Sequence, residues 1–134
     1  MDNLQKFYIN GHWVAPISSA IMPVLNPATE HQIGTVAMGG GADVDQAVAA
    51  AKEAFKTFSQ TSKSERLELL RRLKQVTESR FEELAQAMRM EMGAPITMAR
   101  EIQADAAVGH LQGFIDALET LEERIVLDLS LIHI

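Results

Sequence analysis

The spacing of the apolar residues changes near residue 40. Before that point they alternate with polar residues in two pairs of short segments, residues 6–10 with 12–14 and residues 21–25 with 32–37. A period of two is typical of β-strands. Gly11 separates the first pair, and NPATEH, which opens with the turn formers Asn and Pro, separates the second. The sequence therefore predicts two β-hairpins.

After this point the apolar residues recur at about every 3.6 positions, which predicts amphipathic helices. The first helix is expected to start near Asp43, whose carboxylate can accept from the amides of the first turn. Gln46, three residues on, can reach back and complete a capping box. One face of this helix is apolar over Val44, Ala47, Val48, Ala51, Ala54, Phe55 and Phe58.

The second helical stretch is predicted to begin with another capping box, formed by Ser62 and Glu65. It is expected to bend or restart near Ser79. Gly93 is a glycine suited to a left-handed helix terminus, and Pro95 follows it. The sequence therefore places a helix end at Gly93 and a new helix start near Pro95.

The third helix is expected over residues 96–122 and carries two apolar rows instead of one. Such a helix is typical of a position with protein on more than one side. Gly109 and Gly113, four residues apart, leave room for another helix to approach closely. In a chain of this length, the pattern indicates that a partner layer is missing.

Composition narrows the function classes. The 134 residues favour one domain or part of a larger one, and 47% hydrophobic with 22% charged residues is typical of a globular protein without a membrane span. A net charge of −6 opposes binding to nucleic acid. The N-terminal segment has no signal-peptide pattern, so we expect a cytoplasmic protein. The chain has no cysteine, which removes a thiolate nucleophile.

No pattern of residues predicts catalysis within the chain. The Gly39–Gly41 run precedes a helix and could cradle a phosphate, but no Walker lysine follows and Asp43 places a negative charge there. The histidines lack metal-ligand spacing; they are His12, His31, His110 and His133. Neighbouring acids such as Glu82 and Glu83 point about 100° apart on a helix and cannot share one proton.

Five segments, which follow one another in this order along the chain, carry a resemblance to a known family: FYINGHWV, PVLNPATEHQIGTVA, ADVDQAVAAAKEAF, SERLELLRRL and EMGAPITMAREIQ. Together, from about residue 6 to about residue 125, they resemble the N-terminal segment of the NAD(P)-dependent aldehyde dehydrogenase superfamily. The resemblance implies an α/β fold class: N-terminal β-hairpins plus about three amphipathic helices, an incomplete part of the cofactor-binding domain. The family's catalytic cysteine, general-base glutamate and dinucleotide site lie in parts not present here.

The resemblance also implies ligands and partners. The parent enzyme would oxidise an aldehyde with NAD or NADP and form a homo-oligomer, without nucleic-acid or membrane partners, while this chain alone is not expected to bind the cofactor. No catalytic or cofactor-binding residue carries over. The backbone at Val24 and the carboxylate of Glu91 fall at the positions of a structural monovalent cation site. The alternative, that Glu91 is an ordinary surface acid near a helix end, stays open.

The sequence ends in LSLIHI, residues 129–134, where the resemblance stops. The codons CTG TCT CTT ATA CAC ATC encode this run and resemble the transposon-end adapter used to build sequencing libraries. We therefore expect residues 1–128 to be the N-terminal part of an incomplete aldehyde dehydrogenase domain, and 129–134 to be a non-native tail. The alternative is a native, non-enzymatic small helical module that binds a protein partner.

Overall fold

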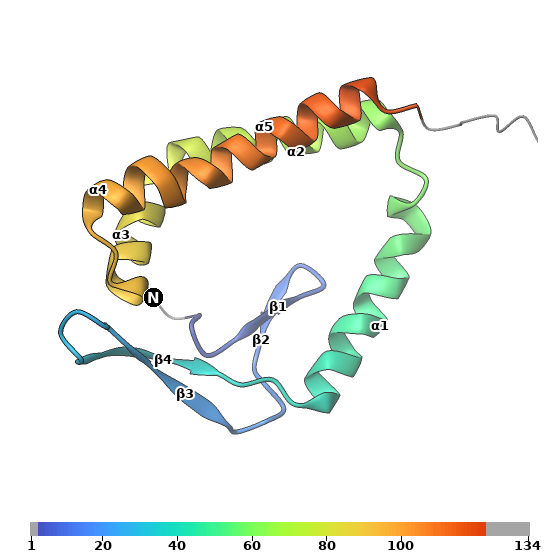
Figure 1. The fold of residues 1–134 in the computed structure, drawn as a ribbon. Helices are drawn as coiled ribbons and strands as arrows, with labels where there is room; N and C mark the ends of the chain where they lie inside the picture. The colour runs from blue at the N-terminus through green and yellow to red at the C-terminus, as the bar shows by residue number, and fades with distance from the viewer. Residues whose placement is uncertain (1–2, 123–134) are drawn as a thin grey trace, which may run out of the picture.

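The computed structural model describes residues 3–122. In this part of the chain two short hairpins and a series of helices surround an opening (Figure 1). The hairpins form two separate two-stranded antiparallel sheets. The expected fold class, β-hairpins followed by amphipathic helices, is confirmed.

The first hairpin pairs β1 (Phe7–Ile9) with β2 (His12–Val14). Its turn residues, Asn10 and Gly11, have φ angles of 52° and 78°. Positive φ at both central residues is typical of the type I′ turn, whose twist matches that of the two strands, and Asn-Gly is its preferred sequence. The predicted hairpin is confirmed, with its first strand ending one residue before Asn10.

The second hairpin pairs β3 (Ile21–Leu25) with β4 (Gln32–Ala37) and has the predicted bounds. Its register shifts between Val24 and Leu25, where Val24 faces Gly34 and Leu25 faces Gln32. Such a bulge disrupts the ladder of backbone hydrogen bonds locally and bends the strand.

Helix α1 (Gly41–Phe58) starts two residues before the predicted position. The N-cap is Gly40, and Asp43 is the third helical residue, whose Oδ2 accepts from the Gly40 backbone N–H at 2.9 Å. The capping box expected between Asp43 and Gln46 is therefore wrong. Asp43 does cap the helix, but as its third residue, whose side chain reaches back to the backbone N–H of the N-cap Gly40.

The long central stretch consists of two helices, α2 (Lys63–Ser79) and α3 (Phe81–Met92), with the expected restart after Ser79. The Ser62–Glu65 capping box is confirmed, since the Ser62 N–H donates to Glu65 Oε2 at 2.7 Å and the Glu65 N–H to Ser62 Oγ at 3.2 Å. Gly93 ends α3 in the left-handed conformation, at φ 70°.

The last helical run differs from the single regular helix predicted for residues 96–122. It comprises α4 (Ile96–Met98), a π-helical segment (Ala99–Ala104) and α5 (Asp105–Thr120). The wider π turn shifts the phase of the side chains between its two flanks. Helix α5 packs beside α2, and Figure 1 shows the two on one side of the opening, with the hairpins on the other. None of the described helices is long and apolar enough to cross a lipid bilayer.

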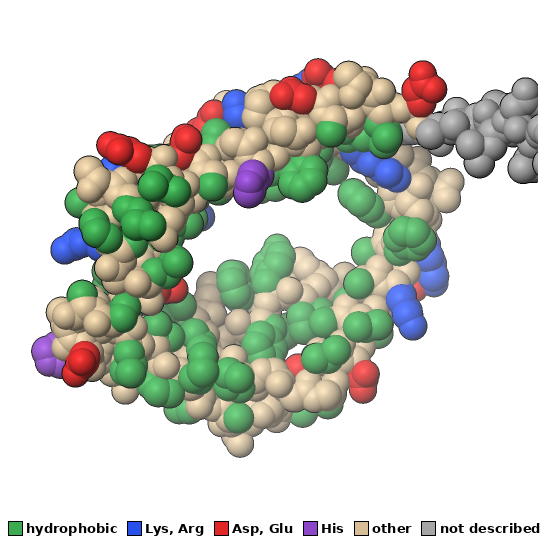
Figure 2. Space-filling model, in the orientation of Figure 1, with side chains coloured by type: hydrophobic (Ala, Val, Ile, Leu, Met, Phe, Trp, Pro, Cys, Tyr) green, Lys and Arg blue, Asp and Glu red, His purple; other side chains and the backbone are tan. Residues whose placement is uncertain are grey.

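Few side chains of the described part are fully enclosed. Ala85, Ala99 and Ala104 form a small core between α3 and the π-helical segment, and Leu67 and Ile115 are buried on α2 and α5. By contrast, 22 large hydrophobic side chains of the described residues are exposed. Figure 2 shows an opening through the molecule with hydrophobic side chains along its rim. The helices and hairpins of the described part therefore form an open frame whose centre none of these residues fills.

Candidate functional site

The C-terminal end of α3 lies against the turn between β3 and β4. A Cβ atom added at Gly93 would lie 2.7 Å from Pro27 Cγ, so the two segments touch. The turn is held by Asn26, whose Oδ1 accepts from the Ala28 N–H at 2.9 Å and whose backbone oxygen accepts from the Glu30 N–H at 2.7 Å. This contact closes one side of the frame.

A shallow cavity of about 270 Å³ lies at this contact. Its lining comes from the β3–β4 turn, the end of α3 and the start of α4, and includes Asn26, Thr29, Arg89, Gly93 and Ile96. It combines an amide, a hydroxyl and a guanidinium with apolar groups. No carboxylate is among the residues that line it.

The structure places the two residues of the expected cation site on the two segments that meet here. Val24 is half-buried in β3 at the bulge, and Glu91 is exposed in the last turn of α3. Within residues 3–122, no group of three or more His, Asp or Glu side chains is placed to hold a metal ion. A site at this position would rest on backbone oxygens and one carboxylate, ligands that suit a hard cation. The cation site stays a prediction.

Asp43 is the buried charged residue of the described part, with 4% of its surface exposed. Its carboxylate accepts from the backbone N–H groups of Ile17 at 2.7 Å, Gly40 at 2.9 Å and Ser18 at 3.4 Å. These bonds stabilise the ionised form, with the Ile17 bond contributing most, and lower the pKa of Asp43 below its usual 3.8. Asp43 thus ties the segment before β3 to the start of α1.

The same geometry bears on the glycine run, residues 39–41. An anion at a helix N-terminus binds to free backbone N–H groups. Here the Gly40 N–H is already bound to the Asp43 carboxylate, and that negative charge occupies the place of a phosphate. The described residues at this helix start therefore do not fit a dinucleotide phosphate.

The acidic pair on α3 points to separate partners, as expected. Glu82 accepts two hydrogen bonds from the Arg100 guanidinium, at 2.7 and 2.9 Å, and Glu83 pairs with Arg80. The bonds from Arg100, followed by one from Gln86, lower the pKa of Glu82 to about 2. Both acids are exposed. The Glu82–Arg100 pair joins α3 to the π-helical segment, whereas the Glu83–Arg80 pair lies within the start of α3. The two acids therefore do not form an acid–base pair.

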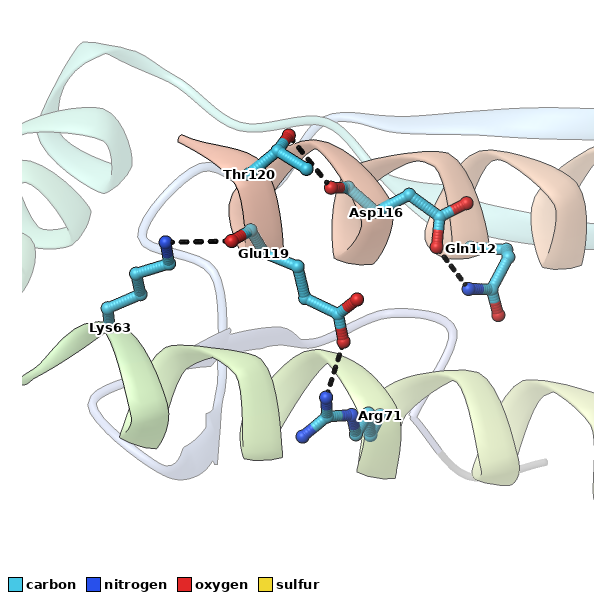
Figure 3. A network of polar contacts seen from close by, with 6 residues as sticks. All are labelled: Lys63, Arg71, Gln112, Asp116, Glu119 and Thr120. Carbon is cyan, nitrogen blue, oxygen red and sulfur yellow. Dashed lines mark hydrogen bonds and ion pairs between the residues drawn. The ribbon is translucent and has the colours of Figure 1, made fainter. Parts of the chain in front are cut away.

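A second polar network joins the start of α2 to the end of α5 (Figure 3). The Lys63 ammonium donates to the backbone oxygens of Glu119 at 3.0 Å and Leu121 at 2.9 Å, and Arg71 pairs with the Glu119 carboxylate. Cations are favourable at a helix C-terminus, where backbone oxygens lack partners. Lys63 therefore fixes the point at which the chain leaves α5. Its partners lie 56 and 58 residues away, so no local sequence pattern predicts them.

Comparison with known proteins gives one consistent result. The sequence model of the aldehyde dehydrogenase family matches residues 13–130. The 3-succinoylsemialdehyde-pyridine dehydrogenase of a Pseudomonas species is 42% identical over 124 residues, which cover 92% of this chain and 25% of that protein. A putative aldehyde dehydrogenase of Staphylococcus saprophyticus is 40% identical over 126 residues, covering 92% and 26%. The chain thus spans about a quarter of the length of these curated relatives.

Solved structures agree with the sequence comparisons. The aldehyde dehydrogenase of Bartonella henselae superposes with a TM-score of 0.92 at 36% identity, over 97% of this chain and 27% of that one. A mutant of aldehyde dehydrogenase C from Pseudomonas syringae, in complex with NAD+ and octanal, gives 0.90 at 46% identity, over 93% and 26%. The open frame described above is therefore also present within complete, folded enzymes.

Proposed function

This chain belongs to the aldehyde dehydrogenase family, and we propose that it is the N-terminal part of an enzyme that oxidises an aldehyde to a carboxylic acid with NAD+ or NADP+. The observation that carries the proposal is the 0.90 TM-score, at 46% identity, with a relative that binds NAD+ and octanal. Use of a nicotinamide cofactor follows from family membership. The bound cofactor would accept the hydride.

The chain's own residues contribute structure to that reaction. The resemblance implies a cysteine nucleophile, and none of the 134 residues is a cysteine. The described residues fix the relative positions of hairpins and helices through the Gly93–Pro27 contact, the bonds of Asp43 and the bonds of Lys63. We propose that the reacting groups come from the remaining polypeptide and that this chain alone is inactive.

The proposal extends to the end of the chain and to the properties of the whole enzyme. The boundary after residue 128 and the adapter-derived tail, residues 129–134, lie outside the described residues, and we retain both as part of the proposal. Homo-oligomerisation and a cytoplasmic location also belong to it. Size-exclusion chromatography and cell fractionation of the complete protein test these two properties.

The deciding experiment starts from DNA. We would amplify and sequence the source DNA downstream of the codon for Asp128, express the complete gene, and follow reduction of NAD+ and NADP+ with octanal and other aldehydes. We expect the frame to continue to a catalytic cysteine and the product to reduce a cofactor. A native stop codon after Ile134 would contradict the proposal, as would a folded complete protein that oxidises none of the aldehydes.

The alternative is a small helical module that binds a protein partner without catalysis. Such a module folds alone, and it would give a cooperative thermal transition as a monomer. The described residues contain five buried hydrophobic residues and 22 exposed large ones. Exposed apolar surface on that scale is typical of a fragment and of species that bind hydrophobic dyes. The open frame therefore favours the enzyme fragment.

A further inference from the structure

The first residues of the described chain lie along one edge of the β3–β4 hairpin. Asn3, Leu4, Gln5 and Lys6 form a turn there, closed by a bond of 3.0 Å from the Lys6 N–H to the Asn3 backbone oxygen. We call these four residues the N-terminal strap. We propose that the strap protects the outer edge of β4, and that without it this edge pairs with the same edge of a second molecule. The inference concerns the hairpin and does not depend on the proposed function.

The hydrogen bonds of the hairpin show which backbone groups of β4 face outward. Met38, the residue after β4, donates from its N–H to the Ala20 backbone oxygen at 2.8 Å, on the β3 side. In an antiparallel pair, successive residues direct their N–H and C=O groups alternately toward the partner strand and away from it. Ala37 and Thr35 therefore direct these groups away from β3. They form the outer edge of β4.

The two central residues of the strap contact this outer edge. The Ala37 N–H donates to the Leu4 backbone oxygen at 3.4 Å, and the Gln5 side-chain amide donates to Thr35 Oγ1 at 2.6 Å. The Leu4 side chain also lies against β4, with its Cδ1 atom 3.8 Å from a Cβ atom added at Gly34. Leu4 is still 49% exposed, so the strap lies on the surface of the hairpin. It covers the edge from outside.

The sequence of β4 is typical of a strand that pairs readily with another strand. Residues 32–42 contain no charged side chain, and β4 contains no proline. Uncharged segments rich in β-formers, here Ile33, Thr35 and Val36, are the ones that self-associate when an edge is open. Proteins block open edges with charges, with proline or with a covering segment. Since β4 has neither a charge nor a proline, its protection depends on a covering segment.

The opposite edge of the hairpin is blocked by its own sequence. Pro23 is the middle residue of β3 and faces Thr35, so the same alternation places it among the residues that face outward. Proline has no N–H and cannot donate to a further strand. One edge of the hairpin is therefore closed by a proline, whereas the other is covered by the strap. This difference between the two edges points to protection as the role of the strap.

A second copy of the same edge is the partner that fits it. Two β4 strands can pair in antiparallel orientation about a two-fold axis, and each strand then offers the other the backbone groups that Ala37 and Thr35 direct outward. Such a contact uses the same patch on both molecules. Neither strand brings a charge that would repel the other, because residues 32–42 have none. Loss of the strap should therefore add a contact between enzyme molecules.

The test compares three variants of the complete enzyme by size-exclusion chromatography with light scattering. A variant without residues 2–5 lacks both central residues of the strap, and its mass should rise to at least about twice that of the wild type. A variant without residues 2–3 keeps Leu4 and Gln5 and is the matched control, which should keep the wild-type mass. Adding Thr35→Lys to the first variant should restore the wild-type mass, because the two paired strands would then carry like charges.

The outcomes separate this inference from the proposed function. A wild-type mass without residues 2–5 overturns the inference, because the uncovered edge then does not pair. Association that persists with Thr35→Lys also overturns it, since the new contact would lie elsewhere or follow from unfolding. Oxidation of aldehydes is measured on the same samples, and its absence contradicts only the proposed function. If the reading frame stops after Ile134, the same three variants of the 134-residue chain provide the test.

Discussion

Gly93→Ala is predicted to open the contact between α3 and the β3–β4 turn. Gly93 has a φ of 70°, where an L-residue with a Cβ costs about 1–2 kcal/mol more than glycine. The added Cβ would also lie 2.7 Å from Pro27 Cγ, in a ring that cannot rotate away. Forcing the turn to shift adds about 1–3 kcal/mol, the usual cost of overpacking. The total is about 2–5 kcal/mol, with no gain in helix propensity because Gly93 follows the last residue of α3.

Hydrogen–deuterium exchange can measure this effect locally, because it reports the opening of individual segments. The Gly93 N–H donates to the Arg89 backbone oxygen and the Ala28 N–H to Asn26 Oδ1. Since 1.4 kcal/mol is a factor of about ten, both amides should exchange at least tenfold faster in the variant. Gly41→Ala is the control, because an added Cβ there has no neighbour within 4 Å. Unchanged exchange near Ala28 in Gly93→Ala would refute the reasoning.

Three further perturbations test the polar contacts. Asp43→Asn should loosen the segment at Ile17 from the start of α1, because a neutral amide accepts less strongly than a carboxylate; limited proteolysis should then cleave the variant faster near Ile17, and an equal rate would count against the tie. The Glu82–Arg100 pair lowers the pKa of Glu82 from 4.5 to about 2. The contribution of this pair to the stability of the fold is therefore complete above about pH 4.5 and is lost as the pH falls toward 2. The free energy of unfolding, followed by circular dichroism, should therefore be higher for wild type than for Glu82→Gln at neutral pH, and this difference should disappear near pH 2. A difference that stays constant with pH would contradict this. Lys63→Met should fray the last turn of α5, seen as faster amide exchange there, and unchanged exchange would show that the backbone oxygens need no cation.

The elements that depend on neighbouring residues could be predicted from the sequence. β-prone segments on the two sides of Gly11 were enough for the first hairpin, and Ser62 with Glu65 was enough for the start of α2. The start of α1 was misplaced because Asp43 can cap either as the first residue or by reaching back from the third. In either position the Asp43 carboxylate accepts from a backbone N–H at the start of the helix, and the sequence does not show which position it takes.

The contacts that close the frame could not be predicted in the same way. Residues 99–104 were predicted as part of one regular helix, with no residue pattern that marks the π-helical turn, and the partners of Lys63 are brought near only by the packing of α5 on α2. Periodicity marks the side of a helix that favours burial, but not the element that buries it. For this reason the pattern predicted Phe55 and Phe58 as an interior face, whereas the described residues leave them 66% and 51% exposed.

Helix α1 gains little stability from packing within the described part of the chain. It has 18 residues, of which Asp43 alone is buried, and Asp43 holds one end of the helix through polar bonds. Most helical stability in proteins comes from packing of the apolar face and not from the intrinsic helix propensity of the residues. The apolar face of α1 has little to pack against among the described residues. We infer that the remaining polypeptide of the proposed enzyme supplies most of the stability of α1, a helix that borders the opening (Figure 1).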